Sequence, residues 1–340
     1  MTAPRLGLTR AQILAHRRRA GALDERLPQR KSSLERAAWA GLQDSMPRAA
    51  VLSIHARVSG TEPSTWEDSS LVQVWGPRFS AYVVAARDRA FFTLGRLPTD
   101  AKGRHRAEDT AARLHAFLDG RRMRYDEAGR GVGVHPNALR YAAPTGTVLM
   151  RWEGARLPVI WTVPRPEIDP HEARLELARR YLHVFGPTTP AAFAKWAGIG
   201  SAEGRAALEA LAGEVMAVRT PIGDQWILTS DEPGFRAIPA PAAPARLLPS
   251  GDPYFLLHGI DRELLVPDEK QRRELWTTRV WPGAVLVGGE VVGTWRRANA
   301  VVAIQAWRRL SASERQAVEA EAESFPLPGL SGQIDVRWDD

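Results

Sequence analysis

The chain has 340 residues, no cysteine, and a net charge of +7 from 46 basic and 39 acidic side chains. Without cysteine, disulfides, thiolate nucleophiles and Cys-ligated zinc or iron–sulfur centres are excluded. A hydrophobic content of 44% and a charged content of 25% are typical of a globular protein, here long enough for two to four domains. Because no stretch approaches the roughly 18 apolar residues of a membrane helix and the N-terminal segment lacks an apolar signal core, we expect a cytoplasmic protein without a membrane partner.

The positive charge is concentrated at the N-terminal end. Residues 1–60 contain eleven Lys/Arg and only four acidic residues, whereas the two signs balance over the rest of the chain. This polarity is expected of an element that binds a polyanion. The alternative is an arginine-rich helix that is merely solvated.

The first segment predicts three helices and then a hairpin. Thr9 is the expected N-cap of a helix from Arg10 to Arg19, and Ser32 or Ser33 would cap a second helix over 34–42. A third helix covers 48–58. Two β-rich runs, 81–84 and 90–94, are joined by a polar turn and predict the hairpin.

The same order of elements recurs twice. The second unit has helical runs at 105–121 and 135–143, followed by paired strands at 148–152 and 158–163. The third unit has predicted helices at 170–185 (capped by Asp169), 189–198 and 201–213, followed by a hairpin of 215–219 with 225–228.

We therefore expect an α+β chain of three tandem winged-helix domains, at 1–100, 101–167 and 168–232. A generic α+β fold is the alternative. The Pro/Ala-rich segment 231–246 is a linker by composition, and 233–340 predicts a small β-barrel-like domain with a closing helix. Its expected elements are β-like runs at 254–257 and 263–266, a hairpin at 284–295, a strand at 301–307 and a helix at 311–325.

Motifs for metal or nucleotide chemistry are missing from the sequence. The eight histidines form no HxxxH or HxH pair, so we expect no metal site. The GRGVG run at 129–133 is interpreted as a turn, because it follows no strand and lacks a Gly-Lys-Ser/Thr ending. The remaining candidate is the Gln43-Asp44-Ser45 junction, where a neutral amide flanked by basic groups can bond a water, a base edge or a sugar. The alternative is that Asp44 and Ser45 only cap a helix.

Several stretches together resemble the winged-helix DNA glycosylases, the AlkZ-type and YcaQ-like proteins. They are GLQDSMPRAAVLSIHARV, QVWGPRFSAYVVAARDRAFF, FGPTTPAAFAKWAG, SGDPYFLLHGIDRELLVPD and VLVGGEVVGTWRR, which appear in the family's order between about residues 8 and 310. The resemblance implies tandem winged helices followed by a β-barrel-like domain. It also implies excision of alkylated purines, unhooking of interstrand crosslinks in some members, and no metal or organic cofactor.

The same resemblance implies a set of site residues. The family motif, Gln–aliphatic–Gln or Gln–aliphatic–Asp, aligns Gln43 with its first position, Asp44 with the aliphatic one and Ser45 with the second catalytic one. An Arg-Gly-Thr-x-His-like element aligns with Arg78 to Tyr82, so that tyrosine replaces histidine. The implied catalytic residues are Gln43, Asp44 and Ser45; the implied DNA-binding residues are Arg48, His55, Arg57, Arg78, Tyr82, Arg17, Arg18 and Arg19.

Three functions remain in competition. The first is a monomeric DNA-repair glycosylase acting on double-stranded DNA. The second is a non-catalytic DNA-binding protein, either a damage sensor or a regulator, which the altered triplet at 43–45 favours. The third is a different hydrolase or an adaptor that binds no DNA, favoured by the charge balance of residues 61–340. Whether a damaged nucleotide is flipped out of the duplex stays open.

Overall fold

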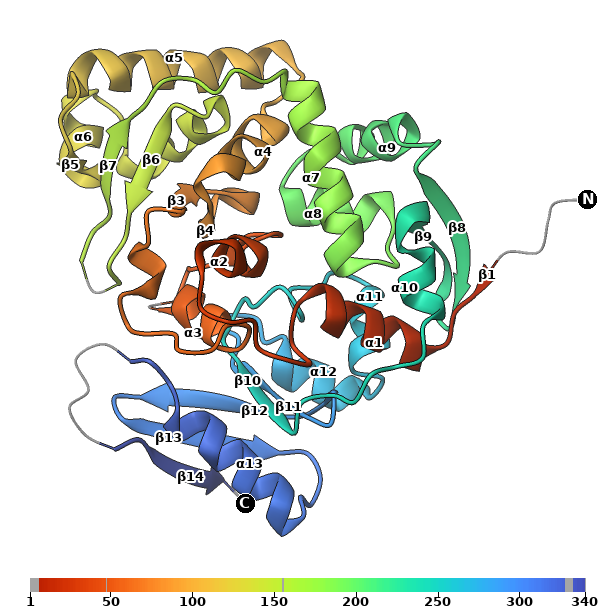
Figure 1. Ribbon diagram of the computed structural model, residues 1–340. Coiled ribbons are helices and arrows are strands. Elements are labelled where there is room, and N and C mark those ends of the chain that lie inside the picture. Colours follow the sequence, from red (N-terminus) through yellow and green to blue (C-terminus); the bar gives the residue numbers. More distant parts are fainter. Residues whose placement is uncertain (1–5, 47, 155, 328–332, 340) are drawn as a thin grey trace, which may run out of the picture.

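The described residues of this computed structural model, 6–46, 48–154, 156–327 and 333–339, form three sheets surrounded by helices (Figure 1). The strand orders are β1-β8-β9, β2-β4-β3-β6-β7-β5 and β10-β11-β12-β13-β14. The mixed α+β class agrees with the prediction. None of the described helices combines the length and apolar character needed to cross a bilayer.

The N-terminal segment lies against the third unit rather than the first. Strand β1 (Leu6–Gly7) pairs in parallel with β8 (Val215–Thr220), and helix α1 (Arg10–Ala20) packs against α7 and α10. Thr9 caps α1 through a capping box with Gln12, as predicted. The first sixty residues are therefore divided between two parts of the molecule.

The predicted hairpin of 81–84 with 90–94 is wrong, because 81–84 pairs with a different strand. Strand β4 (Ala81–Ala85) pairs with β3 (Leu71–Trp75), and the run at 90–94 is helical. A short apolar run does not distinguish strand from helix, and the Thr93 hydroxyl bonds back to the Arg89 carbonyl at 2.8 Å, as helical threonines do. The elements here are α2 (Lys31–Ala37), β2 (Leu42–Gln43), α3 (Ala49–His55), η1 (Thr65–Glu67), β3, η2 (Pro77–Phe79), β4, η3 (Ala86–Asp88), α4 (Arg89–Thr93) and η4 (Leu94–Arg96).

The second unit shares its sheet with the first. The predicted hairpin of β6 (Val148–Arg151) and β7 (Val159–Thr162) is confirmed, and β6 also pairs with β3 through Gln73 and Met150. The expected domain boundary after residue 100 therefore cuts across one six-stranded sheet. The other elements are α5 (Ala101–Leu118), β5 (Met123–Arg124), α6 (Tyr125–Gly131) and the 3₁₀ helix η5 (Pro136–Thr145); α6 covers part of the expected turn at 129–133.

The third unit follows its prediction closely. Helix α7 (Pro170–Phe185) is capped by Asp169, and α8 (Pro190–Ala197) is capped by Thr189. They are followed by α9 (Ser201–Ala210) and by the hairpin of β8 and β9 (Gly223–Leu228). The face of α7 forms much of the largest core, where Tyr181 stacks on Phe185 with ring centroids 4.7 Å apart and lies 5.0 Å from Trp196.

The C-terminal part contains two corrections. The run 263–266 lies largely in helix α11, and 254–257 is a buried turn rather than a strand. The hairpin, the strand at 301–307 and the last helix are confirmed. Strands β10 and β14 are the two edges of their sheet among the described residues. The elements are η6 (Thr229–Asp231), α10 (Glu232–Arg236), β10 (Ala245–Leu248), α11 (Asp261–Leu265), α12 (Glu269–Leu275), β11 (Gly283–Val287), β12 (Glu290–Ala298), β13 (Val301–Ala306), α13 (Ala312–Glu323) and β14 (Asp335–Asp339).

Candidate active site

Gln43 lies on the two-residue strand β2 and pairs with Tyr82 of β4. Its side chain is partly exposed and lies between two loops. On one side, Arg78 Nη2 is 3.5 Å from Gln43 Oε1. On the other, a Cβ at Gly251 would come within 3.2 Å of Gln43 Cδ, and Gly251 has a φ of +80°. Arg78 and Gly251 thus restrict the position of the Gln43 side chain, which remains accessible to solvent.

The turn that carries Arg78 has an unusual backbone. Arg78 and Phe79 adopt φ values of 54° and 58°, a left-handed region that costs L-residues about 1–3 kcal/mol. Gly198, which ends α8, approaches so closely that a Cβ there would lie 2.9 Å from Arg78 N. The buried Arg96 bonds both Trp75 O (3.2 Å) and Ala197 O (2.7 Å). The turn is therefore held by α8 and the end of β3, while the Arg78 side chain stays exposed.

Asp44 is turned away from the site, because successive side chains of an extended segment point to opposite sides. It is 3% exposed. Its Oδ1 accepts the Ala50 N–H of α3 at 3.0 Å, and its Oδ2 accepts from Gln73 Nε2 at 2.6 Å. Burial raises the pKa of Asp44 to about 7. This buried position gives no support to the expected catalytic role of Asp44. Its carboxylate accepts an N–H from the first turn of α3, although the N-cap residue of that helix is Arg48.

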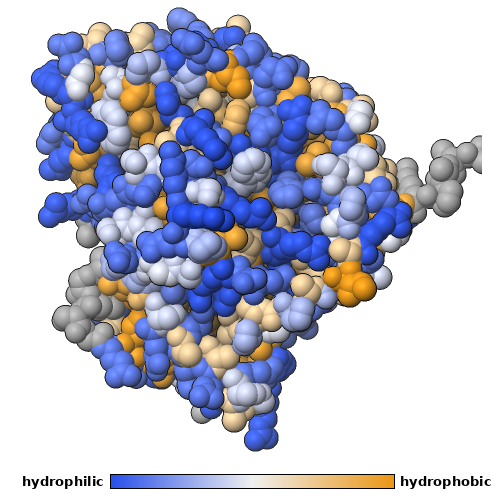
Figure 2. Space-filling model, in the orientation of Figure 1, coloured by the Kyte–Doolittle hydropathy of each residue, from blue (hydrophilic) through white to orange (hydrophobic). Residues whose placement is uncertain are grey.

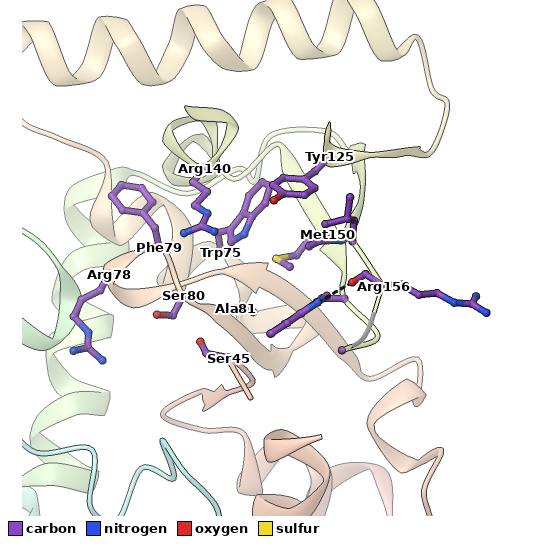
Figure 3. A pocket seen from close by; sticks show the side chains of 14 residues that line it. Ser45, Trp75, Arg78, Phe79, Ser80, Ala81, Tyr125, Arg140, Met150 and Arg156 are labelled. Atoms are coloured by element: carbon purple, nitrogen blue, oxygen red, sulfur yellow. Dashed lines mark hydrogen bonds between the residues drawn. The ribbon is translucent and has the colours of Figure 1, made fainter. Parts of the chain in front are cut away.

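Ser45 borders a cavity of about 450 Å³ between the first two units (Figure 3). Ser45 and Ser80 both line this cavity and lie at its lower edge in Figure 3. Aromatic and arginine side chains dominate the wall, and none of the lining residues carries a carboxylate: Trp75, Phe79, Tyr125, Trp152, Arg78, Arg140 and Arg156. The aromatic rings of this pocket can stack against a flat group, and its arginines can bind a phosphate.

The AlkZ-like DNA glycosylase family model matches residues 35–326, a range that includes Gln43, Ser45, Arg78 and Gly251. The chain belongs to the AlkZ-like DNA glycosylase family. Its fold is similar to that of the Streptomyces sahachiroi DNA glycosylase AlkZ, with a TM-score of 0.78 and 18% identity over 98% of this chain and 100% of that one. A sequence search of curated proteins gave no significant match.

Three of the basic residues implied by the AlkZ-like resemblance remain accessible. Arg78 is exposed next to Gln43. Arg48, at the start of α3, is partly exposed and places its guanidinium 4.6 Å from the centre of the Trp66 ring. Arg19 is partly exposed and donates to Gly234 O at 3.0 Å. These three keep the predicted DNA-binding role as a proposal.

The other three arginines serve the interior, so their expected phosphate contacts do not fit the structure. Arg17 is 1% exposed and donates to Phe185 O and Gly186 O, which lie at the end of α7. Arg57 is 2% exposed and makes two 2.7 Å bonds to Asp252. Arg18 is also buried and bonds Asp24 at 2.7 Å.

His55 and Tyr82 are likewise unavailable to DNA. Tyr82 is fully buried, its ring lying between Gly41 and Gly76, and burial raises its pKa to about 12. His55 Nε2 lies 2.9 Å from Ser324 Oγ, and burial lowers the pKa of this imidazole to about 3. Both residues were expected to bind DNA, and both instead join parts of the core.

Sequence reasoning missed the residues that position Gln43. Asp252 is buried, receives Arg57 and also accepts the Ser53 hydroxyl at 2.7 Å, which fixes the loop carrying Gly251 beside Gln43. In the sequence, the SGD stretch at 250–252 stands out only as part of the family resemblance. A glycine-aspartate pair before a buried apolar run signals a tight turn, but the contact to Gln43 joins residues about 200 positions apart.

Proposed function

We propose that this AlkZ-like protein hydrolyses the N-glycosidic bond of alkylated purines in double-stranded DNA, with Gln43 as the central catalytic residue. The observation that carries the proposal is the partly exposed Gln43 amide, held between Arg78 and Gly251 next to the cavity that Ser45 borders. Three winged-helix units and a β-barrel-like end, acting as a monomer without a cofactor, are part of the same proposal.

The chemistry requires little acid–base power. A purine alkylated on a ring nitrogen is already cationic in DNA and leaves as a neutral base, while the positive charge passes to the sugar through an oxocarbenium-like transition state, as in glycoside hydrolysis. A neutral amide that orients the attacking water or the sugar edge acts by positioning and by favouring the developing positive charge. Gln43 has that role here, and the Ser45 hydroxyl is the second, shorter partner. Arg78 and Arg48 would hold the flanking phosphates.

The test is release of 7-methylguanine from methylated duplex DNA by the native protein and by Gln43→Ala. We expect the variant to lose at least 100-fold in single-turnover rate while binding the duplex as tightly as the native protein, since removing one transition-state hydrogen-bonding group costs about 10²–10³ in rate. Gln305→Ala, an exposed position on β13, is the matched control and should keep the native rate. Native activity that survives Gln43→Ala would contradict the assignment.

The second position is tested separately. Ser45→Gln restores the Gln–x–Gln pattern of the family, and the longer side chain should reach the water that the serine hydroxyl reaches poorly. We expect faster base release than in the native protein, whereas Ser45→Ala should be slower. A rate unchanged in both variants would remove Ser45 from the site.

Ser45 also supports a second candidate function. With a hydroxyl at the second catalytic position and Asp44 buried, the protein could serve as a non-catalytic DNA-binding protein, a damage sensor or regulator. Duplex binding that falls with salt, together with no base release by native protein or Ser45→Gln, would favour this alternative.

The same proposal covers interstrand crosslinks. A cavity of about 450 Å³ with aromatic walls beside Ser45 offers room for an adduct larger than a methyl group. A duplex carrying a purine–purine crosslink should be converted by the native protein to two separable strands, and Gln43→Ala should leave it intact. Excision of methylated purines without unhooking would restrict the substrate to small lesions.

A further inference from the structure

Two histidines and one aspartate from three separate elements lie close together in the structure. His16 lies in α1, His183 in the last turn of α7, and Asp231 at the end of η6. One ring nitrogen of each histidine and one carboxylate oxygen of the aspartate lie within 4.8 Å of one another. The two helices and α10, which follows η6, pack together (Figure 1).

The hydrogen bonds leave lone pairs in this cluster without partners. His16 Nε2 lies 3.2 Å from the His183 carbonyl oxygen, so this nitrogen carries the proton and donates it. His16 Nδ1 is then a buried lone pair with no hydrogen-bond partner. His183 Nδ1 and Asp231 Oδ1 are 2.9 Å apart, whereas Asp231 Oδ2 is buried and unpartnered. Buried polar atoms in native proteins are normally satisfied, so these two unpartnered acceptors in one cluster are available to a ligand.

The residues around His16 hold its ring in place and leave its Nδ1 lone pair uncovered. Its ring stacks on Phe235 with centroids 3.8 Å apart. A side chain at position 234 would cover the free nitrogen, because a Cβ there would lie 2.9 Å from His16 Nδ1, and the residue is glycine. Arg19, which bonds Gly234 O, is the positive group nearby and opposes a cation.

We propose that His16, His183 and Asp231 form a structural zinc site that fastens the N-terminal helix to α7 and α10. Two neutral imidazoles and one carboxylate are a ligand set that Zn²⁺ uses, and water can fill the fourth tetrahedral position. A metal-bound histidine characteristically donates its other N–H to a backbone carbonyl, as His16 does here. Tetrahedral ligands of Zn²⁺ lie about 3.4 Å from one another, and the three candidate atoms here lie within 4.8 Å of one another. No HxxxH pattern marks this site in the sequence, because its ligands come from distant segments.

The site is tested on the full-length, tag-free protein after dialysis against EDTA. Titration with Co²⁺, a spectroscopic substitute for Zn²⁺, should produce the intense visible bands of a tetrahedral ion, saturating at one equivalent. Competition with ZnCl₂ should remove the bands, and Zn²⁺ should raise the Tm of the native protein.

Variants separate this site from adventitious binding to surface histidines. His183→Ala should weaken Zn²⁺ at least tenfold, and so should Asp231→Asn, which preserves side-chain shape if the alanine variant folds poorly. His171→Ala, in the exposed first turn of the same helix α7, should bind as the native protein does. No tetrahedral Co²⁺ spectrum, or equal affinity in the His183 and His171 variants, would show that the cluster is a hydrogen-bonded pair and overturn the proposal. The result is independent of base release.

Discussion

At the scale of single residues, the neighbours Gln43 and Asp44 have different roles. Gln43 presents its amide toward Arg78, whereas Asp44 is buried and accepts two N–H groups. Gln73 extends this network, since its Oε1 accepts the Trp152 N–H at 2.7 Å. Asp44 therefore joins β2, α3, β3 and the end of β6 behind the candidate active site. Asp44 thus helps to hold Gln43 and Ser45 in place.

The buried Asp44 predicts a pH dependence of stability. Its pKa is about 7 in the folded protein, against an ordinary 3.8, because burial disfavours the charge. The folded state thus holds a proton that the unfolded state releases, and this contribution to stability falls as pH rises from about 4 to about 7, then stays constant. We expect the free energy of unfolding of Asp44→Asn, relative to native, to rise by up to a few kcal/mol over that window. Denaturant unfolding at several pH values measures it; a difference that is flat or falls with pH would contradict the prediction.

At the scale of elements, the site depends on where helices and loops end. Helix α8 stops at Gly198 with a φ of +72°, and the absence of a Cβ lets the Arg78 turn approach. The loop at 249–252 ends with Asp252 bonded to Arg57, which brings Gly251 against Gln43. Two helix and loop ends, from parts of the chain more than fifty residues apart, thus set the position of one amide.

Gly198→Ala should therefore damage activity more than stability alone explains. The new Cβ would lie 2.9 Å from Arg78 N and displace that turn. Gly120→Ala is the matched control, with a φ of +75° and no atom within 4 Å of the added Cβ. Both variants should lose about 1 kcal/mol from the left-handed backbone, but only Gly198→Ala should lower base release, by an expected tenfold or more. Equal activity in the two variants would show that the Gly198–Arg78 contact does not affect catalysis.

At the scale of the whole molecule, the net charge of a segment differs from the charge that it exposes at the surface. The N-terminal excess of arginine predicted a DNA-binding surface, yet Arg17, Arg18 and Arg57 are buried in bonds to carbonyls and carboxylates. Hydrophilic side chains cover most of the face in Figure 2, with apolar ones scattered among them. Better candidates for phosphate contact are the arginines around the cavity. They belong to residues 61–340, in which acidic and basic side chains balance: Arg78, Arg140 and Arg156.

Salt dependence distinguishes the two kinds of arginine. Duplex affinity should fall linearly on a log–log plot against salt, and Arg78→Ala should reduce the slope by about 0.9 because one phosphate contact is lost. Arg315→Ala, exposed on α13, removes the same formal charge and should leave the slope close to native. Equal slopes for both variants and the native protein would show that Arg78 makes no phosphate contact.

The sequence by itself determined the local features: the capped helices α1, α7 and α8, the hairpins β6–β7, β8–β9 and β11–β12, and Gln43 as the candidate residue. Capping and short turns depend on residues a few positions apart, so the chain alone specifies them. Only the tertiary structure decided that β3 pairs with β6, that β1 joins β8, and that five of the eight expected DNA contacts are buried. These outcomes depend on which distant segments pack together, because packing removes one arginine from water and leaves its neighbour exposed.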